Sequence, residues 1–291
     1  MKNRKVIHSL PAEKVDMGGF PVKQSLPTNN VSQVDPFLLL HHGKIKPIYD
    51  RPAHIQGVGP HPHRGFSPVT FIIEGEVHHR DSRGNNQIAR EGEVQWMHAG
   101  AGVIHSERPS EALLERRGTQ EIIQLWINTP AKHKMNEPEY LHIIESEIPR
   151  IQTEDGLTDL KLISGKYGEL SGNIRAKSEL LVVWGKSKEN GHVALQIPEG
   201  YNAAIYSVKG NLRIEGHGIV DPESLIVFDN EGDQISLQAD TESQYLILAG
   251  EPINEKMVQH GPFVMNSETE IMEAMRDYQM GKMGVLIEET P

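Results

Sequence analysis

The sequence predicts an all-β protein built from two similar domains, with one short helix near its C-terminus. Short runs of branched and aromatic residues alternate along the whole chain with Gly, Pro, Asn and Asp, a spacing typical of antiparallel sandwiches and barrels. Helical periodicity is rare. The chain has 291 residues, whereas a typical domain has roughly 100 to 200 residues. Two antiparallel β-barrel domains are therefore expected.

The first half of the chain contains the clearest strand patterns. In the last of them, Gln124 and Trp126 share a face with polar and apolar neighbours, while Ile123 and Leu125 share an apolar face. The apolar face is expected to pack in the core and the mixed face to line a cavity. The predicted strands of this half include 69–73, 93–97 and 121–128.

The second half also reads as a series of short strands. They are predicted at 180–184, 192–197, 203–208, 211–214, 225–228, 234–237 and 245–249. A break in the pattern at 131–138 places the boundary between an N-terminal domain, 1–135, and a C-terminal domain, 136–291. A weak internal repeat relates the two, since 198–200 echoes 57–60. Where the first copy has His61 and His63, the second has Tyr201 and Ala203, so the second domain is expected to lack metal ligands.

The C-terminal helix is predicted from its end signals. Ser267 is followed three residues later by Glu270, which fits a capping box, and Gly281 is a typical stop after a helix that runs to about Met280. We expect its apolar stripe to pack on the second barrel.

Composition excludes several classes of function. The net charge of −11 opposes direct binding to nucleic-acid phosphates and to anionic membrane surfaces. No run approaches the roughly 18 apolar residues of a membrane helix, and the small basic cluster at Lys2, Arg4 and Lys5 lacks the apolar run of a signal peptide. We expect a cytoplasmic monomer. There are no cysteines, so any metal must be held by nitrogen and oxygen atoms.

Two histidine-containing pairs could hold such a metal. His61 and His63 flank Pro62, and on an extended backbone residues two apart point to the same side. His105 and Glu107 have the same spacing. If both strands face one interior, they supply three nitrogens and one carboxylate and leave two positions open on an octahedral ion. Spacing alone also allows two unrelated pairs of surface or hydrogen-bonded histidines.

The ligand types favour one divalent metal ion. Neutral histidines with one carboxylate and open positions are typical of non-haem Fe(II), while Mn, Ni, Cu and Zn stay open. Other histidines are less suited to such a site. His78 and His79 are adjacent, so on a strand they face opposite sides and cannot chelate one ion together. His98 is expected to make a local hydrogen bond.

Several ordered blocks of the sequence resemble the pirin branch of the cupin superfamily, and together they span nearly the whole chain. The blocks are GPHPHRGF at 59–66, IEG at 73–75, WMHAGAGVIHSE at 96–107, QLW at 124–126 and GPFVMN at 261–266. The resemblance implies a bicupin, with two jelly-roll β-barrels face to face and a metal in the N-terminal barrel only.

The resemblance also implies the ligand set. In pirins the two histidines of the first block and the histidine and glutamate of the later block bind the metal, which carries over to His61, His63, His105 and Glu107. Ordinary cupins take their glutamate from the first block instead, where this chain has Ser67 and Pro68.

Several pirins resemble quercetin 2,3-dioxygenases in activity, so the implied reaction is the O2-dependent opening of a flavonol such as quercetin. Glu107 is then the expected general base, and Phe66, Gln124 and Trp126 are the candidates for cavity walls around an aromatic substrate. One alternative is a non-enzymatic regulator that binds a transcription factor or a metabolic enzyme and keeps its metal for structure or redox sensing. Another is a different cupin reaction on a different small metabolite.

Overall fold

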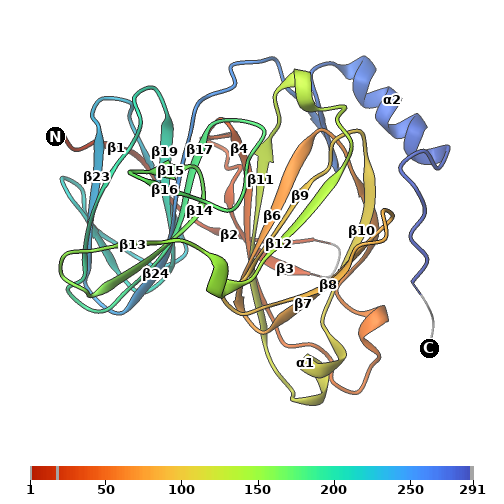
Figure 1. The fold of residues 1–291 in the computed structure, drawn as a ribbon, viewed down its shortest axis with the longest axis horizontal. Helices are drawn as coiled ribbons and strands as arrows, with labels where there is room; N and C mark the ends of the chain where they lie inside the picture. Colours follow the sequence, from red (N-terminus) through yellow and green to blue (C-terminus); the bar gives the residue numbers. More distant parts are fainter. Residues whose placement is uncertain (1, 18–19, 289–291) are drawn as a thin grey trace. The chain divides into compact units, whose positions relative to one another are not determined.

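The computed structural model describes residues 2–17 and 20–288. Contacts divide the chain into two compact units, each assembled from separate stretches. We call one the histidine unit, which comprises Val15–Val22, Leu39–Glu145 and Asn254–Pro291, and the other the second unit, which comprises Met1–Lys14, Lys23–Leu38 and Ser146–Ile253. Most of the described chain is in strands (Figure 1), as the all-β prediction requires.

Two antiparallel sheets contain the strands of the histidine unit, and residues 13–14, 23–26 and 37–38 of the second sheet are counted with the second unit. One has the order β5-β10-β7-β8, with β5 (Val58–His63), β7 (Glu76–Asp81), β8 (Asn86–Arg90) and β10 (Val103–Arg108). The other has the order β12-β9-β6-β11-β4-β3-β2, with β2 (Glu13–Asp16), β3 (Pro21–Leu26), β4 (Phe37–Ile45), β6 (Phe66–Glu74), β9 (Val94–His98), β11 (Gln120–Asn128) and β12 (Glu139–Ile143). The strands predicted in the first half are confirmed in β6, β9 and β11.

The register between β5 and β10 changes near the histidines. His105 lies opposite His61, but Glu107 lies opposite Val58, so β5 uses one residue more than β10 over this stretch. Such a bulge bends a strand and leaves one residue outside the ladder. Pro60 lies in the bulged stretch and has no N–H to lose from the ladder.

The second unit also has two antiparallel sheets. One has the order β1-β22-β19-β24-β17-β14-β13, with β1 (Val6–Pro11), β13 (Arg150–Gln152), β14 (Thr158–Ser164), β17 (Leu180–Ser187), β19 (Asn202–Lys209), β22 (Ser224–Phe228) and β24 (Ser243–Gly250). The other has the order β18-β23-β20-β21, with β18 (His192–Gln196), β20 (Leu212–Ile214), β21 (Gly218–Val220) and β23 (Gln234–Ala239). A small hairpin adds β15 (Lys166–Tyr167) and β16 (Leu170–Ser171). Alternate residues of both sheets form its buried core, including Val183 and Ile205 of the first sheet and Leu195 and Leu237 of the second.

Helical segments are short. The 3-10 turns are η1 (Ala53–Ile55), η2 (Ala131–His133) and η3 (Glu145–Glu147), and the α-helices are α1 (Glu111–Glu115) and α2 (Glu268–Gln279). The sequence pattern gave no indication of α1, whose first turn is capped by the Ser110 hydroxyl. The Ser267 cap of α2 is confirmed, because its hydroxyl accepts from the Glu270 N–H. The Glu270 carboxylate accepts from the N–H of Asn266, one residue before the N-cap, so the reciprocal bond differs from that of a standard capping box. Within the described part of the chain, no helix is long and apolar enough to cross a membrane.

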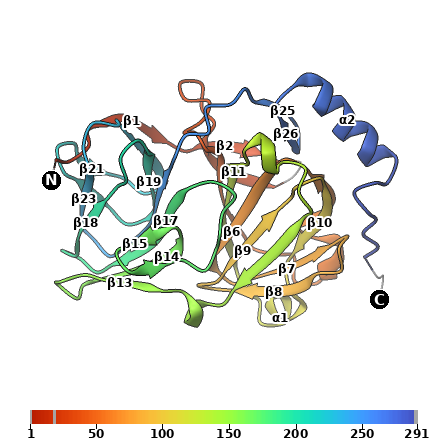
Figure 2. The ribbon, with the colours of Figure 1, turned by 45° about the horizontal axis from the view of Figure 1, so that its top comes forward.

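The prediction that α2 packs on the second barrel was wrong. Ile271 and Ala274 of α2 pack with Phe263 and Met265 of the hairpin strand β26 (Phe263–Met265), and Ile104 of β10 joins this cluster. The partner strand of the hairpin is β25 (Val258–His260). Figure 2 shows β25, β26 and α2 in blue, beside the strands of the histidine unit.

The predicted domains 1–135 and 136–291 differ from the compact units at both ends of the chain. At the N-terminus, β1 pairs with β22 and so joins the second unit. At the C-terminus, the stretch that includes α2 joins the histidine unit. Strand pattern and helix caps identify an element from its own residues, but they do not identify the distant element on which it packs.

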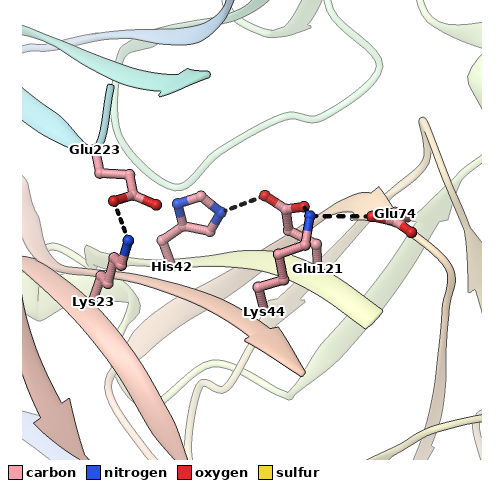
Figure 3. Close-up of polar contacts among 6 residues, drawn as sticks. All are labelled: Lys23, His42, Lys44, Glu74, Glu121 and Glu223. Carbon is pink, nitrogen blue, oxygen red and sulfur yellow. Dashed lines mark hydrogen bonds and ion pairs between the residues drawn. The ribbon is translucent and has the colours of Figure 1, made fainter. Parts of the chain in front are cut away.

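A polar network lies along β4 and β11 of the histidine unit (Figure 3). The buried His42 contacts the Glu121 carboxylate at 2.9 Å, and Lys44 donates to Glu121 at 2.5 Å and to Glu74 at 3.3 Å. Burial alone would raise the pKa of Glu121, but the hydrogen bonds and charges of His42 and Lys44 outweigh it and lower this pKa to about 2. The same figure shows the pair formed by Lys23 and Glu223.

Candidate metal centre

Three histidines converge in the histidine unit. One ring nitrogen from each of His61, His63 and His105 lies within 4.8 Å of the others. The ring centroids are 4.7 Å apart for His61 and His63, 4.3 Å for His61 and His105, and 4.9 Å for His63 and His105. Alternation along β5 puts the first two on one side. The pairing of β5 with β10 then brings His105 opposite His61.

The hydrogen bonds of these rings leave nitrogen lone pairs inside the cluster. His61 Nδ1 lies 2.8 Å from the Gly59 carbonyl, which only accepts, so Nδ1 carries the proton and Nε2 keeps its lone pair. That Nε2 lies 3.1 Å from Nε2 of His63. Among the described residues, the buried Nε2 of His105 has no hydrogen-bond partner. A buried polar atom without a partner is costly, and a bound cation would satisfy it.

Electrostatics keep two of the rings in the form that binds metals. His63 and His105 are each 2 % exposed. Burial lowers the pKa of both well below 6.5, and the neighbouring histidines lower it further. Neutral imidazole is the ligand form for divalent ions. The three converging nitrogens and the absence of cysteine therefore fit a divalent ion that accepts nitrogen and oxygen ligands.

Glu107 is not part of the three-histidine cluster. Its carboxylate accepts a hydrogen bond from the Thr70 hydroxyl at 2.9 Å and another from Nε2 of Gln124 at 2.8 Å. Nε1 of Trp126 donates to Oε1 of Gln124 at 3.2 Å. Because an indole N–H only donates, this contact turns the amide N–H2 of Gln124 toward Glu107. The metal ligand and general base roles of Glu107 stay predictions.

Aromatic rings flank His63. The ring of Phe66 lies 5.1 Å from the His63 ring and that of Trp126 lies 5.4 Å from it, and the two aromatic rings are 4.4 Å apart. Gln124 and Trp126 lie on one face of β11, as the alternation predicts. The structure thus brings Phe66, Gln124 and Trp126 close to the predicted ligands, and their role as cavity walls stays a prediction.

Three polar residues of this region, namely Thr70, His79 and Asp81, were not predicted from the sequence. Nδ1 of His79 lies 3.4 Å from Nδ1 of His105, and Nε2 of His79 lies 3.2 Å from Asp81. Burial alone would raise the pKa of Asp81, but hydrogen bonds from His79, Asn85 and the Arg83 backbone lower it. The signal was present in the sequence, since His79 and Asp81 have the same i, i+2 spacing as His61 and His63.

The remaining histidine predictions have clear outcomes. Nδ1 of His98 contacts the Ser67 hydroxyl at 2.8 Å, which confirms the expected local hydrogen bond. Across the described residues, the cluster of His61, His63 and His105 is the group of three or more candidate ligands that the structure assembles. In the second unit, Asn202 lies in the stretch that corresponds to the His61 and His63 pair, and its side-chain amide donates to the Asp35 carbonyl at 2.7 Å.

Comparison with known proteins identifies the family. The family model "Pirin" matches residues 19–127, and the model "Pirin C-terminal cupin domain" matches residues 182–284. A Pseudomonas aeruginosa protein named "Putative quercetin 2,3-dioxygenase" is 38 % identical over 268 residues, covering 91 % of this chain and 92 % of that protein. A pirin-like protein of Solanum lycopersicum is 34 % identical over 269 residues, covering 91 % of this chain and 88 % of that protein.

Solved structures share the fold. A crystal structure of quercetin 2,3-dioxygenase from Acinetobacter baumannii superposes with a TM-score of 0.90 at 34 % identity, covering 98 % of this chain and 100 % of that one. The pirin YhhW from Escherichia coli, solved in complex with nickel(II), has a TM-score of 0.66 at 21 % identity, covering 84 % of this chain and 99 % of that one. The two family models and the full-length relatives together show that this chain, with its two cupin domains, belongs to the pirin family.

Proposed function

We propose that this chain is a metal-dependent dioxygenase that opens a flavonol such as quercetin with O2. The observation that carries the proposal is the convergence of His61, His63 and His105 on one point. The names of the relatives from Pseudomonas aeruginosa and Acinetobacter baumannii support the choice of reaction. The substrates are then a small aromatic molecule and O2, and the products are a depside ester and carbon monoxide.

The three histidines would hold one divalent ion through their ring nitrogens, with Glu107 as the fourth ligand. Fe(II) is the metal we propose, because neutral histidines with one carboxylate and open positions suit non-haem iron. The nickel in the Escherichia coli pirin supports a divalent ion at a pirin site. When bound, the ion would supply Lewis acidity toward the 3-hydroxyl and 4-carbonyl oxygens of a flavonol.

Glu107 is the group we assign to proton transfer. A carboxylate that accepts the 3-hydroxyl proton leaves the flavonol as the anion that reacts with O2. Thr70 and Gln124 each donate to one oxygen of Glu107, which fixes the plane of the carboxyl group. A general base must meet its proton within hydrogen-bond reach, so this fixation favours transfer. Phe66 and Trp126 supply flat apolar surfaces next to His63, against which an aromatic substrate can stack.

The test is turnover of quercetin by protein reconstituted anaerobically with Fe(II). After air is admitted, we expect the visible absorbance of quercetin to fall and one carbon monoxide to be released for each quercetin consumed. Glu107→Gln should lower the rate by about 100-fold or more, since a general base contributes roughly 10²- to 10⁴-fold. If no O2-dependent loss of quercetin occurs with Fe, Mn, Ni or Cu, the proposed reaction is wrong.

A further inference from the structure

We propose that His79 and Asp81 form a relay that positions His105 for the metal, although neither would touch the ion. The inference rests on the metal centre proposed above. It concerns which nitrogen of His105 carries the proton and how its ring is held. Carboxylate–histidine pairs behind a ligand raise its basicity and fix its orientation.

Strand pairing puts the relay behind the site. In the pairing of β10 with β7, His105 lies opposite Asp81, and Glu107 lies opposite His79. Residues two apart on a strand share a face, so all four side chains point to the same side of this sheet. His79 and Asp81 are 2 % and 4 % exposed. A buried carboxylate and a buried imidazole are therefore placed directly beside the buried His105.

Proton donors and acceptors along the relay can be assigned in one consistent way. Asp81 accepts from the Arg83 N–H at 2.9 Å and from the Asn85 amide at 2.7 Å, which holds it as a carboxylate acceptor. Nε2 of His79, at 3.2 Å from Asp81, must then be the donor, and Nδ1 of His79 keeps a lone pair. Nδ1 of His105, at 3.4 Å, donates to that lone pair.

The assignment leaves the lone pair of His105 on Nε2. This nitrogen is the buried atom that has no hydrogen-bond partner among the described residues. The relay thus directs the one free lone pair of His105 away from His79. If Nδ1 of His105 were unprotonated instead, two lone pairs would face each other across 3.4 Å, and Nε2 would carry a buried proton without an acceptor.

Stacking fixes the ring of His79. Its plane lies 13° from the ring of Tyr140, with the centroids 4.1 Å apart. The strand neighbour His78 provides a matched control, because it faces the opposite side and contacts the Asn86 side chain at 2.6 Å. His78 is the same residue type on the same strand, and its side chain points away from the relay.

The test is a titration of the full chain with Co(II), followed by the visible bands of the bound ion. Wild type should bind one Co(II). His79→Phe keeps a flat ring against Tyr140 but removes both nitrogens, and we expect the affinity to fall about 10- to 100-fold with a shift of the bands. His78→Phe should match the wild type in affinity and spectrum.

Two further variants separate positioning from simple loss of packing. His79→Asn places a polar atom where Nδ1 was, so it should recover part of the affinity. His79→Gln reaches toward Asp81 but not toward His105, so it should resemble His79→Phe. Thermal unfolding of each variant checks that it is folded, and the order of the Asn and Gln variants decides the question if His79→Phe does not fold.

The outcomes separate this inference from the proposed centre. Wild-type protein that binds no Co(II) overturns the metal centre and the relay together. Wild-type protein that binds Co(II), with His79→Phe equal to it in affinity and spectrum, overturns the relay alone. Equal affinities for His79→Asn and His79→Gln would also contradict it.

Discussion

Arg64 and Asp277 are 213 positions apart in the chain, yet both terminal nitrogens of the Arg64 guanidinium donate to one oxygen of Asp277 at 3.1 Å. Arg64 directly follows His63 on the chain, and its Nε donates to the Ala101 carbonyl at 2.7 Å. Its backbone N–H donates to Pro262, and its carbonyl accepts from Val264. The C-terminal stretch is therefore attached to the backbone beside a predicted metal ligand.

Removing this ion pair should destabilise the protein. Asp277→Ala leaves the Arg64 guanidinium, only 5 % exposed, without its carboxylate partner. Hydrogen bonds to charged groups contribute about 1.5 to 3 kcal/mol each, and we expect a loss of that size in urea unfolding. Glu273→Ala changes an exposed carboxylate of the same helix and should stay within about 0.5 kcal/mol of wild type. Equal losses for the two variants would contradict the assigned role of the pair.

Gly65 should tolerate no side chain. Its φ is +85°, and an added Cβ would collide with the Val264 carbonyl. Gly84 has a similar φ of +91°, but no atom of the described residues lies within 4 Å of such a Cβ. Gly84→Ala should therefore lose only the strain of the left-handed backbone, about 1 to 2 kcal/mol.

Gly65→Ala has the same left-handed backbone strain and, in addition, the collision of its Cβ with the Val264 carbonyl. We expect Gly65→Ala to lose at least about 2 kcal/mol more than Gly84→Ala, in the range of core-disrupting changes. Differential scanning calorimetry of the two variants measures the difference. A smaller or reversed difference would contradict the close contact between the Val264 carbonyl of β26 and Gly65 in the turn between β5 and β6.

Gln124 should act through Glu107. Gln124→Met removes the N–H2 that holds Oε2 of Glu107 and the oxygen that accepts from Trp126. We expect kcat for quercetin to fall about 10- to 100-fold, the effect of misplacing a reacting group by about 1 Å, with a smaller change in KM. The exposed Gln87→Met is the matched control and should leave both constants unchanged. A change in KM alone would assign Gln124 to substrate binding instead.

The polar network around Glu121 should make stability depend on pH in acid. Its folded pKa is lowered from 4.5 to about 2, so the unfolded chain takes up the proton first as pH falls. The stabilisation is complete above pH 4.5 and is lost between pH 4.5 and pH 2. In Glu121→Gln this part of the pH dependence should disappear. Urea unfolding of both proteins from pH 7 to pH 2.5 measures the difference, and parallel curves would contradict the assignment.

Much of the histidine cluster could be predicted because it depends on local rules. The i, i+2 spacing of His61 and His63 fixes their common side without knowledge of any other strand. Joining them to His105 needed the resemblance to pirins, since spacing alone does not show that β5 pairs with β10. The bulge that shifts Glu107 relative to β5 contains Pro60, a residue type that sheets accommodate at bulges, but its place in the register follows only from the assembled sheet.

The remaining features depend on tertiary pairing. Adjacent residues on a strand face opposite sides, so His78 and His79 do not chelate one ion together. The same alternation turns His79 toward His105. The helix α2 was recognised by its caps but placed on the wrong barrel, because contacts such as Arg64 with Asp277 leave no local trace in the sequence. Thr70 was missed for the same reason, since its only signal is its contact with Glu107 across strands.

The central claim is that His61, His63 and His105 hold one divalent ion, and elemental analysis of purified protein tests it most directly. After anaerobic loading with Fe(II) and removal of excess metal, we expect one ion per chain in wild type and in His78→Ala. Folded His63→Ala should retain close to none. A full equivalent of metal in His63→Ala, or none in wild type, would contradict the assignment of the metal centre.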